Sequence, residues 1–271
     1  MRFCGRDLDE DAELVDCVNE EIDDLEPLRA LRSLRVLRIE TTNPHETFEH
    51  RLRDLEPLRG LVHLEVVELP ATRIEDLGPL ADLPELRRLD VARTEVRDLG
   101  PLHAARRLSS LRISSTPVED LSPLAGLVEL RELDISGTAV SDLSPLGGLP
   151  NLADLRLRDA PVADLAPVAG LPALRDAHGL DLTGTRVVSL EPIAAAKDLR
   201  ELRLIGAPVE DLGPLSALRE LELLRIDGTR VRDIAPLQRL AHLRRLSLAR
   251  TAVPPAQVQD LQRALPELEV D

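Results

Sequence analysis

A short phrase, Asp-Leu-x-Pro-Leu or a close variant, recurs through most of this 271-residue chain. The intervals between its prolines are 30, 22, 22, 22, 22, 22, 25, 22 and 22 residues. The prolines are Pro27, Pro57, Pro79, Pro101, Pro123, Pro145, Pro167, Pro192, Pro214 and Pro236. A constant period of this length means that one structural unit is repeated and that neighbouring units bury a continuous core. We therefore expect one solenoid rather than one or two ordinary globular domains.

The apolar positions of one repeat predict its local structure. After Pro123 they are Leu124, Leu127, Leu130, Leu133, Ile135, Val140 and Leu143. The alternation of Leu133, Asp134 and Ile135 indicates a short strand. The predicted fold is an α/β solenoid: a right-handed leucine-rich-repeat horseshoe with a parallel sheet on its concave face. Because 22 residues leave no room for a full helix, we expect short 3-10 or turn segments on the convex side.

Two polar positions of the repeat have a structural explanation. Thr138 follows the strand, where its hydroxyl is expected to bond backbone groups of the turn. Asp142 stands three residues before Pro145, which predicts a cap on a tight helical turn. The threonine recurs as Thr72, Thr94, Thr116, Thr185, Thr229 and Thr251, with Ala160 and Ala207 in two repeats. The aspartate recurs as Asp76, Asp98, Asp120, Asp164, Asp211 and Asp233.

The same register extends toward both ends of the chain. It places Val15 and Cys17 on strand positions near the start, and Leu268 and Val270 near the end. We expect an acidic N-terminal cap with a degenerate first repeat in residues 1–24, leucine-rich repeats in 25–253, and a C-terminal cap of a helix and a final strand in 254–271. Two insertions interrupt the period, near residues 43–51 and 176–178.

The Asp-Leu-x-Pro-Leu phrase, the Leu-x-x-Leu-x-x-Leu-x-Leu pattern and the 22-residue period resemble bacterial internalin-type leucine-rich repeats. The leucine-rich-repeat regulatory subunit of type-one protein phosphatase is also similar. The resemblance extends over residues 14–271 and implies a curved scaffold whose concave face binds a protein. This chain differs in having threonine where the family usually has asparagine. It also lacks concave aromatic residues and surface-anchoring segments.

Charge and composition limit the classes of partner. The net charge is −15, and residues 1–26 hold eleven acidic residues against Arg2 and Arg6. Nucleic acid is not expected as a partner, because phosphate binding requires a basic surface. The acidic residues 1–26 either form a solvated cap or attract a basic partner. No apolar run reaches membrane-spanning length, so no membrane association is expected.

The two cysteines, Cys4 and Cys17, have no metal-binding spacing. Because Cys17 falls on a core position, the sequence favours a reduced, buried thiol; a Cys4–Cys17 bridge in a secreted protein is the alternative. The first residues, MRFCGRDLDED, contain no hydrophobic segment and are not expected to form a signal peptide. With Met1 as the native start, the sequence predicts a cytoplasmic protein.

The side chains that point out of the predicted strands are not needed for the core. The middle outward column consists of Asp16, Arg38, Glu68, Asp90, Arg112, Asp134, Arg156, Asp181, Arg203, Arg225 and Ser247. Its sign alternates from Asp90 to Arg203, which either neutralises neighbouring strands or offers a platform for a charged partner. Arg203 beside Arg225 is a like-charge step that could meet an external carboxylate or phosphate. Asp227, on the same strand, could instead neutralise Arg225.

The 43–51 insertion is either a partner contact or a neutral insertion. Its HETFEH segment does not match the HExxH zinc pattern, because Glu49 stands where the second histidine would be. No catalytic, cofactor-binding or metal-binding residues are predicted, so an enzyme is not expected.

We predict a monomeric, bacterial, non-catalytic scaffold that binds another protein through the concave face and the 43–51 loop. The alternative is a regulatory subunit or inhibitor of an enzyme such as a phosphatase. The candidate partner-binding residues are Arg112, Asp134, Arg156, Arg158, Asp181, Arg203, Arg225, Asp227, His45, Phe48 and His50.

Overall fold

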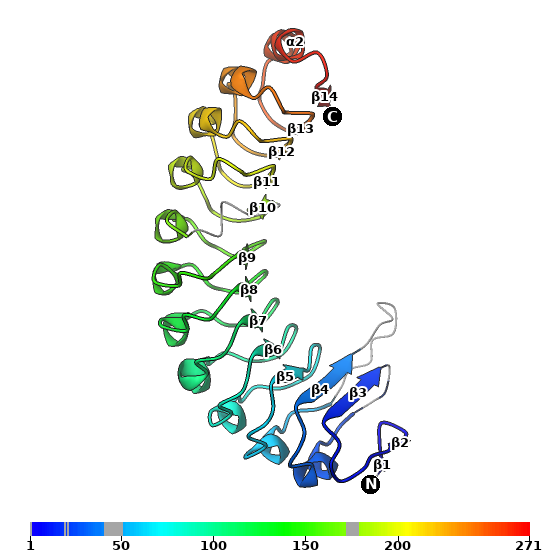
Figure 1. Cartoon of the computed structure of the whole chain (residues 1–271). Coiled ribbons are helices and arrows are strands. Elements are labelled where there is room, and N and C mark those ends of the chain that lie inside the picture. Colours follow the sequence, from blue (N-terminus) through cyan, green and yellow to red (C-terminus); the bar gives the residue numbers. More distant parts are fainter. Residues whose placement is uncertain (1, 19, 21, 41–50, 172–178) are drawn as a thin grey trace. The chain divides into compact units, whose positions relative to one another are not determined.

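The computed structural model describes residues 2–18, 20, 22–40, 51–171 and 179–271 (Figure 1). Of the two insertions, residues 43–50 and 176–178 therefore lie outside the described residues, and only Arg51 at the end of the first is described. The chain consists of two compact units, Met1–Asp134 and Ile135–Asp271.

The first unit repeats a strand followed by a 3-10 helix. It begins with an antiparallel hairpin of β1 (Arg2–Phe3) and β2 (Arg6–Asp7). Its parallel strands are β3 (Leu14–Val18), β4 (Val36–Glu40), β5 (Val66–Glu68), β6 (Arg88–Asp90), β7 (Ser110–Arg112) and β8 (Glu132–Asp134). Its 3-10 helices are η1 (Glu26–Ala30), η2 (Glu56–Leu58), η3 (Gly78–Leu80), η4 (Gly100–Ala104) and η5 (Ser122–Leu124).

The second unit continues the same alternation. Its strands are β9 (Asp154–Arg156), β10 (Leu180–Asp181), β11 (Glu201–Arg203), β12 (Leu223–Arg225), β13 (Arg245–Ser247) and β14 (Glu269–Val270). Strands β10 to β14 form one parallel sheet in chain order. The helices are η6 (Ser144–Leu146), η7 (Ala166–Val168), η8 (Glu191–Ile193), η9 (Gly213–Ala217), η10 (Ala235–Arg239) and α2 (Pro255–Ala264). The predicted parallel sheet with short 3-10 segments on the other side is confirmed (Figure 1).

Leucine layers hold the repeats together. The register places Leu89 opposite Leu111 and Leu111 opposite Leu133, so each leucine packs against its counterpart one repeat away. All three side chains are at most 1% exposed. Full burial of a leucine contributes about 1.5–3 kcal/mol. The repeated leucines therefore supply the stability that fixes the strands in register.

The threonine ladder stabilises the turn that follows each strand. The hydroxyl of Thr138 donates to the carbonyl oxygen of Ile135 at 2.7 Å, and Thr138 is 5% exposed. The same bond to the carbonyl three residues earlier forms at Thr72, Thr94, Thr116, Thr185, Thr229 and Thr251. This confirms the predicted role of the hydroxyl at this position.

The repeated aspartate lies one residue before the N-cap leucine or isoleucine of its 3-10 helix and accepts the first N–H of that helix. Asp98 Oδ1 accepts the backbone N–H of Gly100 at 2.7 Å, and Pro101 follows inside η4. Equivalent bonds are made by Asp76, Asp120, Asp142, Asp164, Asp211 and Asp233. Hydrogen bonds from the Ser144 hydroxyl and backbone N–H lower the pKa of the Asp142 carboxyl. The prediction of Asp capping with Pro at the helix start is confirmed.

The C-terminal register differs from the prediction. Leu246 of β13 lies opposite Val270, not opposite Leu268 as a 22-residue step would require. The reason is that α2, an α-helix of 10 residues, replaces the shorter 3-10 segment of the other repeats. Leu268 is instead buried ahead of β14.

The prediction of a reduced Cys17 thiol is wrong. Cys4 and Cys17 form a disulfide with a Cα–Cα distance of 5.7 Å, within the usual range for such bonds. Cys17 is on the buried side of β3 and is 1% exposed. The β1–β2 turn brings Cys4 to the same side of β3, which gives the buried sulfur a partner.

Candidate interaction surface

Side chains alternate with the buried leucines on each strand and form an exposed surface, here called the open face. Its central column in the first unit contains Asp16, Arg38, Glu68, Asp90, Arg112 and Asp134. In the second unit the column contains Arg156, Asp181, Arg203, Arg225 and Ser247. These positions can vary without disturbing the leucine layers, so a binding surface can be built on them.

The open face of the first unit is largely self-neutralised. Arg38 Nε lies 2.6 Å from Glu68 Oε2, and Arg88 Nε lies 3.8 Å from the other oxygen of Glu68. Arg112 Nη1 lies 3.7 Å from Asp90 Oδ2 on the preceding strand. Arg112, one of the candidate residues, therefore forms the predicted ion pair with the neighbouring strand. Asp134 lies opposite Arg112 in the register.

Two carboxylates lie side by side in this face. The register places Glu68 opposite Asp90, a like-charge step in addition to Arg203 and Arg225. Their side chains are only 12% and 14% exposed. Burial raises the pKa of Asp90, while the Ala92 N–H and Arg112 act in the opposite direction. The nearby arginines thus serve first to compensate these buried carboxylates.

An apolar row lies beside this column. Leu14 is opposite Val36, and Val36 is opposite Val66. Leu14 is 53% exposed, and Val18 of the same strand is 41% exposed. Leu14, Val36 and Val66 therefore form a short apolar row on three neighbouring strands.

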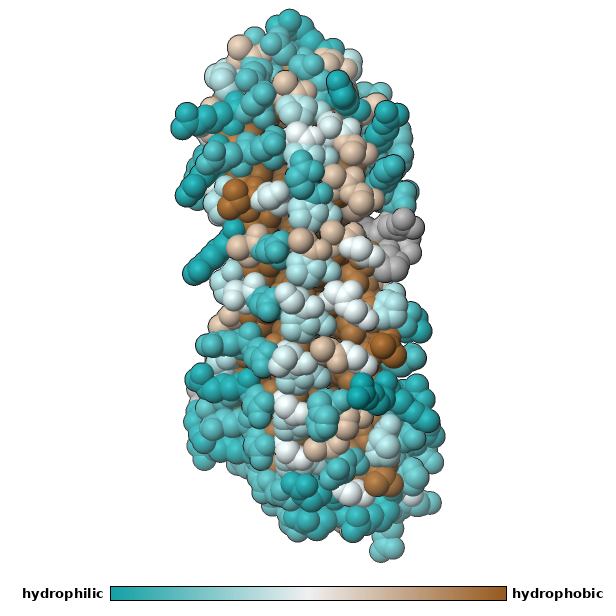
Figure 2. Space-filling view, turned by 90° about the vertical axis from the view of Figure 1, so that its left-hand side faces the viewer, coloured by the Kyte–Doolittle hydropathy of each residue, from teal (hydrophilic) through white to brown (hydrophobic). Residues whose placement is uncertain are grey.

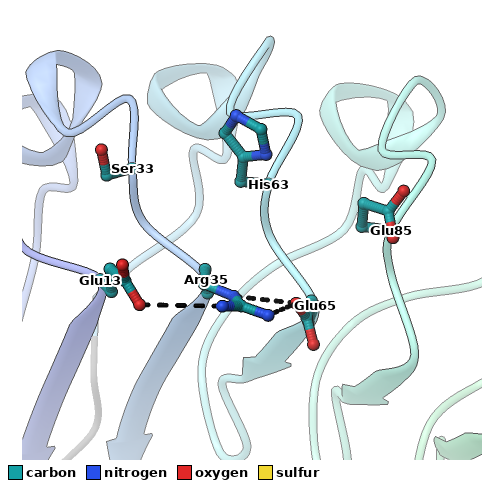
Figure 3. Close-up of a pocket in the computed structure, with 6 residues that line it drawn as sticks. All are labelled: Glu13, Ser33, Arg35, His63, Glu65 and Glu85. Carbon is teal, nitrogen blue, oxygen red and sulfur yellow. Dashed lines mark hydrogen bonds and ion pairs between the residues drawn. The ribbon is translucent and has the colours of Figure 1, made fainter.

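A second row of alternating charges runs along the edge where the strands of the first unit begin. Arg35 forms ion pairs with Glu13 and Glu65, and Arg87 pairs with Glu65 at 3.7 Å. Figure 3 shows Arg35 pointing between the two glutamates, with His63 above them. These side chains line an open hollow of about 390 Å³ with Ser33 and Glu85. Sequence reasoning considered only the outward strand positions and missed this row, although its 22- or 30-residue spacing is visible in the sequence.

Several candidate residues of the second unit are engaged within their own strand or turn. Arg156 Nη2 donates to Asp154 at 2.8 Å, and Arg158 Nε lies 3.2 Å from Asp159. Arg203 Nη2 donates to Glu201 at 2.9 Å. Asp181 accepts the backbone N–H of Thr183 at 3.0 Å.

Arg225 differs from these residues. It is exposed and lies opposite Arg203 in the register. Asp227 Oδ1 accepts the Ser247 hydroxyl at 2.7 Å and the Ala249 N–H at 3.1 Å, and no ion pair joins Asp227 to Arg225 in the described residues. Within the described part of the chain, Arg225 forms no ion pair.

The opposite side of each unit offers little for recognition. Figure 2 shows the side that carries the 3-10 segments, with hydrophilic flanks, a pale centre and only scattered hydrophobic atoms. Three large apolar side chains are exposed away from the strands, at Val62, Val128 and Val188. They belong to separate repeats, and scattered single apolar residues are normal on a protein surface.

Three candidate residues, His45, Phe48 and His50, lie outside the described part of the chain. Across 2–40 and 51–271, apart from the undescribed positions, no group of three or more His, Cys, Asp or Glu side chains could hold a metal ion. In the same residues, no helix has the length and apolar character needed to cross a bilayer.

Comparison with solved structures agrees with this architecture. An internalin (InlF) from Listeria monocytogenes superposes with a TM-score of 0.81 at 24% identity, covering 94% of this chain and 72% of that one. A second Listeria monocytogenes protein, internalin C2, has a TM-score of 0.63 at 28% identity, covering 70% and 82% of the two chains. The fold is a leucine-rich-repeat solenoid.

Other leucine-rich-repeat structures share the fold at lower identity. The plant peptide hormone receptor RGFR1, solved in complex with RGF2, has a TM-score of 0.70 at 14% identity. The match covers 96% of this chain and 51% of the receptor. No family model matches the sequence, and no curated protein is significantly similar to it. The similarity to internalins is therefore structural, and a relation to the phosphatase subunit remains a prediction.

Proposed function

We propose that this protein is a non-catalytic module that binds another protein on the open face of its strands. The observation that carries the proposal is that each repeat has one set of residues for folding and a separate set on the open face. Leucine, threonine, aspartate and proline account for the core and the turns, whereas the open-face side chains are ordered by the sheet but differ from repeat to repeat. A rigid surface with variable side chains is the arrangement that repeat proteins use for binding.

The plant receptor RGFR1, solved in complex with RGF2, supports this proposal by analogy. Fold similarity does not establish function. The open face supplies the more specific support, since arginine is enriched at the centres of protein interfaces. Arg112 and Arg203 sit in the middle of this face, one in each unit.

The test is affinity purification with mass spectrometry. Wild-type bait is compared with two variants, Arg112→Ala and Arg203→Ala. The matched control is Arg219→Ala combined with Arg239→Ala, because Arg219 and Arg239 are exposed and lie outside the strands. Loss of the same prey from an open-face variant, but not from the control, supports the proposal. Equal capture by all baits, each with a wild-type circular dichroism spectrum, would refute it.

Two finer parts of the proposal are separated by the same experiment. A variant with residues 43–51 scrambled is tested in the same way. If it still captures the prey, the loop and its residues His45, Phe48 and His50 are not part of the binding surface. An enzyme such as a phosphatase among the preys, with its activity altered by the pure protein, would favour the regulatory alternative over a scaffold.

The disulfide bears on the compartment in which we propose that the protein is located. Disulfides persist in oxidising compartments and are rare in the reducing cytoplasm. The Cys4–Cys17 bond therefore supports an extracytoplasmic protein, in place of the cytoplasmic location expected from sequence. Thiol labelling of the protein taken from its native cells checks this, since free thiols at both positions would restore the earlier interpretation.

A further inference from the structure

Two arginines on the open face of the second unit have no partner in the described residues. Arg225 is on β12 and Arg245 is on the neighbouring β13. Both side chains belong to exposed residues, and no ion pair joins either of them to a carboxylate. The register places Arg225 beside Ser247 and Arg245 beside Leu223, so the two arginines are diagonal neighbours.

The carboxylates closest in register form no ion pair with either arginine in the described residues. Glu201 accepts from Arg203 at 2.9 Å. Asp227 accepts from Ser247 and Ala249. Glu269 of β14 lies opposite Arg245 but forms no ion pair with it within the described residues. Two guanidinium charges are thus left unmatched on one side of the sheet.

The spacing of the two arginines suits an extended acidic segment. Neighbouring strands are about 4.8 Å apart and residues rise about 3.3 Å along a strand. The Cα atoms of Arg225 and Arg245 are therefore about 8 Å apart, close to the roughly 7 Å between alternate side chains of an extended chain. A guanidinium group matches a carboxylate bidentately. Leu223, 7% exposed, supplies an apolar floor between Glu201 and Arg245.

The distribution of charge makes this cluster unusual in the molecule. Residues 135–271 contain 16 basic and 19 acidic residues, a net charge of −3 out of −15 for the whole chain. Most open-face arginines of the first unit compensate buried carboxylates, as Arg38 and Arg112 do. Arg225 and Arg245 have no such structural task. We propose that the open face of β11–β13 binds an acidic, extended segment of a partner protein, with Arg225 and Arg245 each meeting one carboxylate. This inference rests on the proposed function and names the chemistry of its partner.

The probe is a fluorescein-labelled peptide of alternating serine and glutamate, and the control peptide has glutamine in place of glutamate. Binding is measured by fluorescence anisotropy at low and then rising salt. We expect the full-length protein to bind the acidic peptide, and Arg225→Ala with Arg245→Ala to weaken binding by about tenfold or more. Removing the competing charge with Glu269→Gln should strengthen it.

The matched control is Arg186→Ala with Arg232→Ala, which removes the same charge from exposed positions outside the strands. It should change the Kd by less than about twofold. The inference is overturned if wild-type protein ignores the acidic peptide, if the glutamine peptide binds equally, or if the control pair weakens binding as much. A prey that still depends on Arg112 or Arg203 while the peptide fails to bind would leave the proposed function standing and reject this site alone.

Discussion

The turn that follows each strand supports a stability prediction based on a single backbone angle. One residue of this turn has a positive φ in nearly every repeat. It is glycine at Gly137, Gly184, Gly206 and Gly228, with φ between 66° and 73°. In other repeats it is Ala71, Arg93, Ser115, Asp159 or Arg250, with φ between 56° and 58°. The left-handed conformation costs a residue with a Cβ atom about 1–2 kcal/mol, so five repeats contain a backbone penalty that four others avoid.

Gly206 isolates this effect. A Cβ atom added there meets nothing within 4 Å, so Gly206→Ala changes the conformational preference without a steric clash. We expect the free energy of unfolding to fall by about 1 kcal/mol. At Gly184, a Cβ atom would lie 3.2 Å from the backbone Cα of Asp159, a tight contact that rotation of the Asp159 side chain cannot relieve. Gly184→Ala should therefore cost more than Gly206→Ala.

The reverse substitution should stabilise the protein. Arg93 is exposed at φ 58° and has no side-chain bond in the described residues. Arg93→Gly removes the left-handed penalty but adds chain entropy to the unfolded state, so the net gain should be about 0.5 kcal/mol. Urea denaturation, followed by far-ultraviolet circular dichroism, measures all three variants; a constant m-value shows that only stability has changed. The reasoning is refuted if Gly206→Ala is neutral or if Arg93→Gly destabilises.

Three further changes test the polar positions and the disulfide. Thr138→Val should lower the free energy of unfolding by about 1 kcal/mol, because one buried hydrogen bond is lost; urea denaturation measures it. Burial raises the pKa of Asp90 in the folded protein above its value in the unfolded chain. The free energy of unfolding should therefore fall as the pH rises from the unfolded pKa through the folded pKa, because the buried carboxyl must become charged. Asp90→Asn should remove this decrease, and urea midpoints of both proteins across this pH window measure it. Reducing the Cys4–Cys17 bond should cost about 2–3 kcal/mol, and a Cys4→Ala, Cys17→Ala variant should show the same midpoint with and without reductant.

The fold was predictable because the repeat specifies it many times over. One leucine column or one Asp-Leu-x-Pro-Leu phrase would be ambiguous, but agreement across repeats fixes the strand position and the turn. The register of the C-terminal end was predicted wrongly because the repeat no longer applies there. Once α2 replaces the 3-10 segment, the 22-residue step no longer applies, and Val270 rather than Leu268 takes the place opposite Leu246. The disulfide also lay outside the repeat, since it depends on where a two-strand hairpin places Cys4.

The candidate surface was predictable only as a set of positions. A sequence column shows that Arg112 and Arg203 both point outward, but not which carboxylate each will choose. Arg112 pairs across strands with Asp90, whereas Arg203 pairs along its own strand with Glu201. An arginine side chain reaches both kinds of neighbour, so a small difference in local packing decides between them. For this reason Arg225 could not be recognised as unpaired until the bonds of Asp227 were known.

That distinction bears on how a repeat protein acquires a specific function. An exposed ion pair contributes only about 0–1 kcal/mol to stability, so the ordered charges of the open face can change at little cost to the fold. A pair that satisfies itself, such as Arg38 and Glu68, presents little net charge to a partner. An arginine without a carboxylate presents its full charge and all its donors. Selection for binding would therefore act by removing the intramolecular partner as readily as by adding the arginine. Position 247 is consistent with this, because the column that holds carboxylates at Asp90 and Asp181 holds a serine beside Arg225.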